Sequence, residues 1–250
     1  MKVFSVVGLH HNGKTTAVKH LIHYIKEKGF SISSIKDIHK EDFTMETEGS
    51  NSHIHLTASN TCVFARGQKE TYLIWNRQLR FQEMLNHINT EWLIIEGMKE
   101  LPLPKIIAAK NIEDVETLLD DTVFAITGAL SEKINEYKGI PVINAINGIE
   151  RLGDLVLNKV FEVLPLANEG FCGHCGYSCY EMTKMILKGE KSRDDCGLKI
   201  SQQISIKFND EEIVMNDWVQ KLSKDMILAF CKNLKGYKEG DEVEVRIKNI

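Results

Sequence analysis

The first 165 residues alternate short apolar runs with longer stretches whose apolar residues recur at helical spacing. The run Val3–Val7 predicts a buried strand, Thr15–Lys28 a helix that ends at Gly29, and Ser31–Ile35 a second strand. Later strands are expected at Thr61–Ala65, Thr71–Trp75, Trp92–Ile95, Lys105–Ala109, Thr122–Ile126 and Pro141–Ile143, and helices at Arg77–Ile88, Ile112–Leu119 and Ile149–Val163. Because strands that alternate with helices form sheets covered by helices, the pattern predicts an α/β fold with a doubly wound, mostly parallel sheet.

The alternation stops near Pro165, and two smaller segments follow. Residues 168–200 are rich in Gly and Cys around one helical stretch, Tyr180–Leu187, and are too few to form a large core. The last stretch predicts strands at Ser205–Phe208, Glu212–Met215 and Glu242–Ile247, with a helix at Asp217–Leu234. We therefore predict a large α/β domain at 1–165, a metal-bound four-cysteine domain at 168–200, and a small ββαβ module at 203–250.

Composition narrows the class of protein. Of the 250 residues, 43% are apolar and 26% are charged, which excludes disordered and fibrous chains. No apolar run approaches the ~18 residues of a membrane span, and Val3–Val7 is too short for a signal peptide. We expect a cytoplasmic protein with no membrane partner.

Charge is uneven along the chain. Its net charge is −4, yet residues 1–40 contain seven Lys and two acidic residues, a local charge of +5. A basic start on an acidic chain indicates a local anion site rather than a nucleic-acid-binding surface.

A phosphate-binding loop lies within this basic region. Residues 8–15, Gly-Leu-His-His-Asn-Gly-Lys-Thr, fit the pattern G-x-x-x-x-G-K-S/T directly between a predicted strand and a predicted helix. The glycines let backbone N–H groups face phosphates, while Lys14 would reach the β- and γ-phosphates and the Thr15 hydroxyl would hold Mg²⁺. The expected nucleotide-binding residues are Gly8, Leu9, His10, His11, Asn12, Gly13, Lys14, Thr15 and Thr16, together with Lys36.

An acidic residue for the metal is found at the end of another strand. The buried run Trp92–Ile95 leads into Glu96, and Gly97 permits a sharp turn there. Lys36 and Asp37 end the second predicted strand and would face the same crevice, because open α/β sheets bind ligands at the carboxyl ends of their strands. Lys14 and Glu96 are therefore the candidate catalytic residues, with Thr15 and Glu96 as Mg²⁺ ligands.

Further short motifs accompany the phosphate-binding loop, in order, across residues 1–165. They are Ile35-Lys36 followed by His39, Gly49-Ser50-Asn51-Ser52 with Leu56 and Ala58, Ile95-Glu96-Gly97-Met98-Lys99, and Pro104-Lys105-Ile106. Together they resemble the molybdopterin-guanine dinucleotide biosynthesis protein B (MobB) family. The resemblance implies a P-loop GTPase fold, bound GTP, a homodimer, and assistance in attaching GMP to molybdopterin, with molybdopterin or its guanylyltransferase as partner.

The chain departs from that family at two places. The family commonly has Asp-Ser at Asn51-Ser52, and an Arg-containing stretch at Leu56–Asn60. A missing carboxylate and a missing Arg near the phosphates predict a weak GTPase that acts as an accessory factor. The guanine-reading motif Asn-Lys-x-Asp is absent from the sequence, so guanine specificity is implied by the resemblance alone.

Four of the six cysteines lie within a short segment. Cys172, Cys175 and Cys179 are followed after a predicted helix by Cys196, and this spacing favours a [4Fe–4S] cluster, because one tight loop can supply three thiolates and a later residue the fourth. Zinc is the alternative, although four-Cys zinc sites usually use two close-spaced pairs. The segment resembles the four-cysteine domain of the Rnf complex B subunit, with one residue fewer between the second and third Cys. Cys62 and Cys231 are expected to be buried apolar residues.

These features support one main hypothesis and two rivals. The main hypothesis is a GTP-binding accessory protein of molybdenum or tungsten cofactor biosynthesis that carries an iron–sulfur cluster. One rival is a scaffold that inserts iron–sulfur or metal clusters and uses nucleotide hydrolysis to change conformation. The other is a redox adaptor with a vestigial nucleotide site.

Overall fold

A parallel sheet of five strands forms the centre of the computed structural model, which describes residues 1–40, 43–166, 175–198, 207–208, 211–212, 217–238 and 243. The strand order is β2-β5-β1-β6-β7, and every neighbouring pair is parallel. The strands are β1 (Lys2–Val7), β2 (Ile32–Lys36), β5 (Trp92–Glu96), β6 (Lys105–Ala108) and β7 (Val123–Thr127). All residues of β5, β6 and β7 are buried, as expected for a parallel sheet covered on both faces. The predicted α/β fold with a mostly parallel sheet is confirmed.

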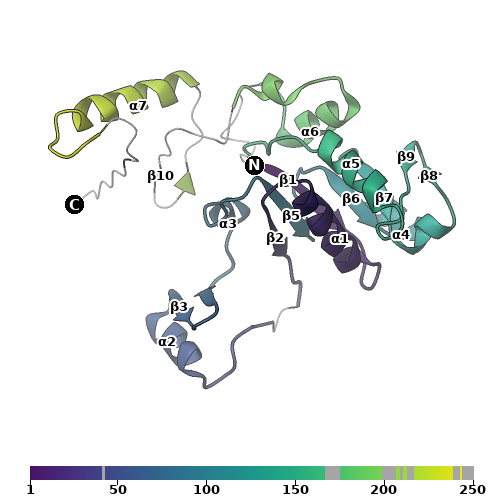
Figure 1. Ribbon diagram of the computed structural model, residues 1–250, viewed down its shortest axis with the longest axis horizontal. Helices are drawn as coiled ribbons and strands as arrows, with labels where there is room; N and C mark the ends of the chain where they lie inside the picture. The colour runs from purple at the N-terminus through teal and green to yellow at the C-terminus, as the bar shows by residue number, and fades with distance from the viewer. Residues whose placement is uncertain are drawn as a thin grey trace.

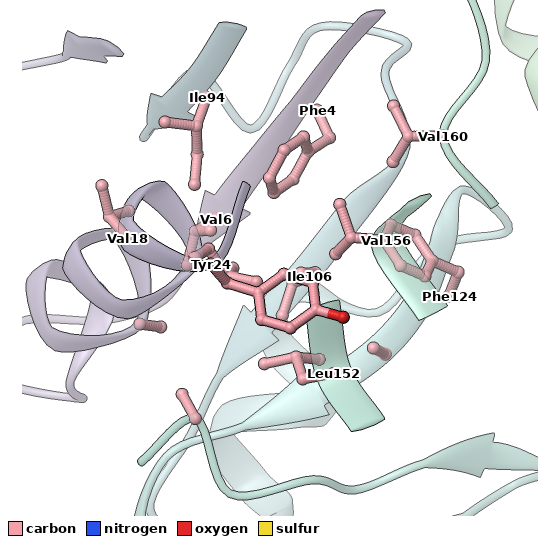
Figure 2. Close-up of a cluster of buried hydrophobic side chains, with 14 of the residues drawn as sticks. Phe4, Val6, Val18, Tyr24, Ile94, Ile106, Phe124, Leu152, Val156 and Val160 are labelled. Carbon is pink, nitrogen blue, oxygen red and sulfur yellow. The ribbon is translucent and has the colours of Figure 1, made fainter. Parts of the chain in front are cut away.

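One face of the sheet is covered by α1 (Lys14–Glu27) and α5 (Ile149–Lys159). Figure 2 shows the side chains that meet there: Phe4, Val6, Ile94 and Ile106 from the strands, and Val18, Tyr24, Leu152 and Val156 from the helices. The Tyr24 hydroxyl donates to Asp154 Oδ1 at 2.5 Å, and the ring leaves no room for a side chain at Gly153. This packing holds α1, and with it the loop before α1, against the sheet.

The opposite face carries α3 (Phe81–Leu85), α4 (Ile112–Leu118) and α6 (Cys179–Lys188). Phe81 and Met182 pack with Val3 of β1 and with Leu93 and Ile95 of β5. Val115 of α4 packs instead with Val7 and Ile107, beside Leu130 of the short 3-10 helix η1 (Ala129–Glu132). Helices on both faces make the sheet doubly wound, and α6 packs on the same sheet as the elements that precede it.

Residues 49–76, here called the arm, lie apart from the central sheet beyond the end of β2 (Figure 1). The arm consists of α2 (Asn51–Ser59) and an antiparallel hairpin of β3 (Cys62–Arg66) and β4 (Thr71–Trp75). Both strands occur where the sequence predicted them, but they form their own two-stranded sheet, so their assignment to the layered α/β pattern was wrong. Helix α2 was not among the helices that the periodicity predicted; Ser50 caps it by accepting from the backbone N–H of His53 at 3.2 Å.

Other differences concern the ends of elements. The helix expected at Arg77–Ile88 is only α3, since Glu83 accepts from the backbone N–H of Arg80 at 2.8 Å and starts the helix there. The helix expected at Ile149–Val163 ends at Lys159, because the chain turns extended at Val160. The strand expected at Pro141–Ile143 is divided: β9 (Ile140–Pro141) pairs with β8 (Glu136–Tyr137), and Val142 bridges Ile126 of β7.

In the C-terminal part, the structure describes several separate stretches with regular elements. They are η2 (Arg193–Cys196), β10 (Lys207–Phe208), β11 (Glu211–Glu212) and α7 (Asp217–Cys231). The rest of the strands predicted at Ser205–Phe208 and Glu212–Met215, and all but Val243 of the strand predicted at Glu242–Ile247, lie outside the described residues. Among the described helices, none has both the length and the apolar character needed to span a bilayer.

Candidate functional site

The phosphate-binding loop connects the end of β1 to the first residue of α1, as the sequence predicted. Gly8 lies so close to β6 that a Cβ there would come within 2.5 Å of the Ala108 carbonyl oxygen. Gly13 has a φ of +88°, a conformation that side-chain-bearing residues rarely adopt. The two glycines therefore allow the loop to pass close to β6 and to turn into α1, whose first backbone N–H groups have no partner within the helix.

Lys14 closes this loop from within. Its Nζ donates to the carbonyl oxygens of Gly8 at 2.9 Å and Leu9 at 2.7 Å. Partial burial lowers the pKa of Lys14; the charge of Glu96 opposes the shift and that of Lys36 adds to it. The ammonium group is thus held inside the loop by the loop's own backbone.

Glu96 is the centre of a second group at the same edge of the sheet. Its side chain is 6% exposed and accepts from the Thr15 hydroxyl at 2.9 and 3.0 Å. Lys36, whose side chain is 55% exposed, forms an ion pair with the same carboxylate. A buried carboxylate needs such partners to offset its desolvation. The strand register supplies Lys36, since Glu96 lies between Val6 of β1 and Lys36 of β2.

The turn after Glu96 is held by Asp37. The backbone N–H of Asp37 donates to the Glu96 carbonyl at 2.9 Å, and its carboxylate accepts from the backbone N–H of Met98 at 3.2 Å. His39 lies 3.1 Å from the same carboxylate oxygen. Met98 has a φ of +49°, so Asp37 stabilises a left-handed turn that keeps Glu96 at the sheet edge.

Asn12 joins the loop to the other half of the sheet. It is 4% exposed, and its amide donates to Asp114 Oδ2 at 2.8 Å, in the first turn of α4. The same oxygen accepts from the backbone N–H of Lys110 at 3.0 Å. Asp114 was not among the predicted site residues, because no motif around it in α4 indicates a contact with a loop about a hundred residues earlier. The remaining loop residues Leu9, His10, His11 and Thr16 are exposed.

A cavity of about 310 Å³ lies beside Thr15, Lys36 and Glu96. Its further walls come from α1, with Lys19 and His23, and from β2, with Ser34. Thr15, Lys36 and Glu96 therefore border open space between α1 and β2, at the carboxyl edge of the sheet.

The cysteine segment lies on the face of the sheet that carries α6, opposite the face that carries α1. Cys196 is 3% exposed within the apolar cluster that contains Val3 and Leu93, and Cys175 and Cys179 pack against that cluster. Cys172 lies outside the described residues, which include no group of three or more His, Cys, Asp or Glu side chains placed to hold a metal ion. Arg193 holds the segment in place by donating to the carbonyls of Glu162 at 2.8 Å and Leu198 at 2.6 Å.

The residues of the site lie in a part of the chain that is similar to known proteins. A family model described as molybdopterin guanine dinucleotide synthesis protein B (MobB) matches residues 3–129, which include the phosphate-binding loop, Lys36 and Glu96. A Methanocaldococcus jannaschii protein with the provisional name molybdopterin-guanine dinucleotide biosynthesis adapter protein is 28% identical over 255 residues, covering 99% of this chain and 97% of that protein.

Two Bacillus subtilis comparisons cover the N-terminal part. A protein provisionally named as the same adapter is 28% identical over 147 residues, which are 57% of this chain and 85% of that protein. The crystal structure of Bacillus subtilis MobB matches with a TM-score of 0.54 and 26% identity, over 64% of this chain and 99% of that chain. The archaeal relative, in contrast, is similar along the cysteine segment and the C-terminal part as well.

Proposed function

Because the chain belongs to the molybdopterin guanine dinucleotide synthesis protein B (MobB) family, we propose that it binds GTP and acts as an accessory protein in the attachment of GMP to molybdopterin. The observation that carries the proposal is the convergence of Lys14, Thr15 and Glu96 at one edge of the sheet, within the residues that match the family. The names of the archaeal and bacterial relatives support the same pathway.

Each residue of the site has a distinct part in nucleotide binding. The loop N–H groups and the N-terminus of α1 bind phosphate oxygens, and Lys14 leaves the Gly8 and Leu9 carbonyls to meet the β- and γ-phosphates. The Thr15 hydroxyl and the Glu96 carboxylate, 2.9 Å apart, form an oxygen set that fits Mg²⁺, which would neutralise phosphate charge when bound. Lys36 offsets the charge of Glu96.

Nucleotide binding is coupled to the arm through β2. Lys36 is the last residue of β2, and the chain runs from there through Asp37 to the arm. If Mg²⁺ compensates the charge of Glu96 and the phosphates attract the Lys36 ammonium, Lys36 would leave Glu96, and the segment that leads to the arm would lose one of its anchors on the sheet. Slow hydrolysis of the γ-phosphate would restore this anchor, so the position of the arm would report the nucleotide state to a partner.

The arm supports a homodimer. A two-stranded hairpin is at best marginally stable alone in water, yet Phe64 is 69% exposed, Ile54 56% and Tyr72 45%. None of the three core clusters formed by the described residues includes an arm side chain. A second copy of the chain would bury these side chains and pair the open strand edges.

Phe64→Glu is expected to convert a dimer into monomers, because it places a charge in the apolar surface of β3 that the second copy would cover. Sedimentation equilibrium measures the mass directly. Gln68→Glu, at the exposed turn of the same hairpin, adds the same charge and serves as the control that stays dimeric. A wild-type monomer, or a Phe64→Glu dimer, contradicts the role of the arm.

We further propose that Cys172, Cys175, Cys179 and Cys196 bind a [4Fe–4S] cluster, with zinc as the alternative. All-thiolate ligation suits either. The supporting observation is that Cys175 and Cys179, the first residue of α6, pack against the apolar cluster that contains Cys196.

The accessory role is tested by adding the protein to a molybdopterin guanylyltransferase from the same source, with molybdopterin and GTP. We expect faster formation of molybdopterin guanine dinucleotide, measured by chromatography of the released cofactor. The rival role is measured in parallel, as iron transferred to an apo-ferredoxin with and without GTP. No acceleration of dinucleotide formation contradicts the proposal, and GTP-dependent iron transfer in its place would identify a cluster-insertion scaffold.

A further inference from the structure

Asn144 lies at the same edge of the sheet as the phosphate-binding loop, beyond β7. Val142 bridges Ile126 of β7 in parallel, and the backbone N–H of Ile143 donates to the Ile126 carbonyl at 2.8 Å. Residues 142–143 therefore extend the sheet by one position past β7, and Asn144 follows at the carboxyl end. With strands about 4.8 Å apart, Asn144 is about 14 Å across the sheet from β1.

The site residues define the direction in which a bound nucleotide runs. Thr15, Lys36 and Glu96, the residues that would hold the metal and the terminal phosphates, lie on the β5 and β2 side of the loop. The nucleoside then extends over the β6 and β7 side. There the turn at Gly128 packs directly on the loop, since a Cβ on Gly128 would come within 2.9 Å of the Asn12 carbonyl oxygen. This side is thus lined closely by backbone, and it leads toward Asn144.

The side-chain amide of Asn144 has a fixed orientation. Its Oδ1 accepts from the backbone N–H groups of Ile146 at 2.8 Å and Asn147 at 3.1 Å. Backbone N–H groups can only donate, so the carbonyl end of the amide must face them, and its two lone pairs are both engaged. Within the part of the chain that the structure describes, the Nδ2 amino group donates to no other group.

We propose that Asn144 selects guanine by donating from Nδ2 to O6 of the bound base. Guanine presents an acceptor at this position and adenine an amino donor, so the fixed amide favours the first and opposes the second. Ile146, 54% exposed on the same turn, offers an apolar surface to the base. The inference rests on the proposed binding of GTP and explains how guanine is read without an Asn-Lys-x-Asp motif.

Wild-type protein provides the first part of the test, with GDP, IDP and ADP titrated by calorimetry. Hypoxanthine keeps O6 and lacks the 2-amino group, so IDP should bind about as tightly as GDP. ADP should bind about ten- to a hundredfold more weakly, the range expected when a buried donor faces a donor. If IDP binds as weakly as ADP, guanine is read through its 2-amino group and the proposal is overturned.

Asn144→Asp provides the second part. The aspartate keeps an acceptor for the Ile146 and Asn147 N–H groups, so the turn is retained, but it presents a second acceptor in place of the amino group. GDP and IDP affinity should fall at least about tenfold while ADP affinity stays equal or rises. Asn147→Asp, exposed on the same turn, carries the same change of charge and should leave the ratio of GDP to ADP affinity unchanged.

The two failures are distinguishable. If wild-type protein binds none of the nucleotides, the proposed GTP function falls, and the assignment of Asn144 falls with it. If wild-type protein binds GDP and Asn144→Asp weakens all three nucleotides equally, or none of them, the assignment of Asn144 alone is overturned.

Discussion

Lys14→Ala is expected to weaken GTP binding by at least about thirtyfold relative to the wild-type protein. Lys14 already lies inside the loop, within 2.9 Å of the Gly8 carbonyl, so little rearrangement is needed for it to meet phosphates. Removing one partner of a desolvated, hydrogen-bonded charge pair costs about 2–5 kcal/mol. At about 1.4 kcal/mol per factor of ten, this is a loss of roughly thirtyfold to several thousandfold in affinity, measured by calorimetry with GTP and Mg²⁺.

The matched control is Lys26→Ala. Lys26 is exposed near the other end of the same helix, so its removal takes away the same charge without touching the loop. Its affinity should match the wild type, and circular dichroism should show that both variants keep their helices. A Lys14→Ala protein that binds GTP within about threefold of the wild type would contradict the assignment of the phosphate-binding loop.

Cys196→Ser should remove the iron of the anaerobically purified protein. The wild type is expected to contain about four iron atoms per chain, the content of the proposed [4Fe–4S] cluster. Cys196 is 3% exposed in the apolar cluster against which Cys175 and Cys179 also pack, so the Ser hydroxyl would replace the proposed fourth thiolate at a buried position. Metal analysis and the visible absorption of the cluster report the loss.

Cys62→Ser is the control for the cysteine segment. Cys62 is half-buried in β3 of the arm, outside the segment, and its replacement should leave the iron content unchanged. Stoichiometric zinc in the wild-type protein would replace iron as the bound metal. Iron that remains at full content in Cys196→Ser would contradict Cys196 as a ligand.

Local sequence patterns predicted most strands and the phosphate-binding loop. The runs that became β1, β5 and β7 are continuous and apolar because each strand is buried on both faces, and such runs are visible without any partner. The phosphate-binding loop could be predicted equally well, because its glycines and Lys14 lie close together in the sequence. The sheet to which β3 and β4 belong could not be predicted, because an apolar run does not indicate which strands it pairs with.

The sequence by itself determined the central parallel sheet and the residue types needed to hold a nucleotide. Only the tertiary structure decided the contacts themselves: that Glu96 accepts directly from Thr15 and pairs with Lys36, that Asn12 is bonded to Asp114, and that the Asn144 amide is held in one orientation. Pairing and strand order join residues far apart in the chain through contacts whose energy depends on the whole packed core. Such contacts produce no pattern in the sequence around either partner. Strands, turns and loops do, because they depend on residues that are close together in the chain.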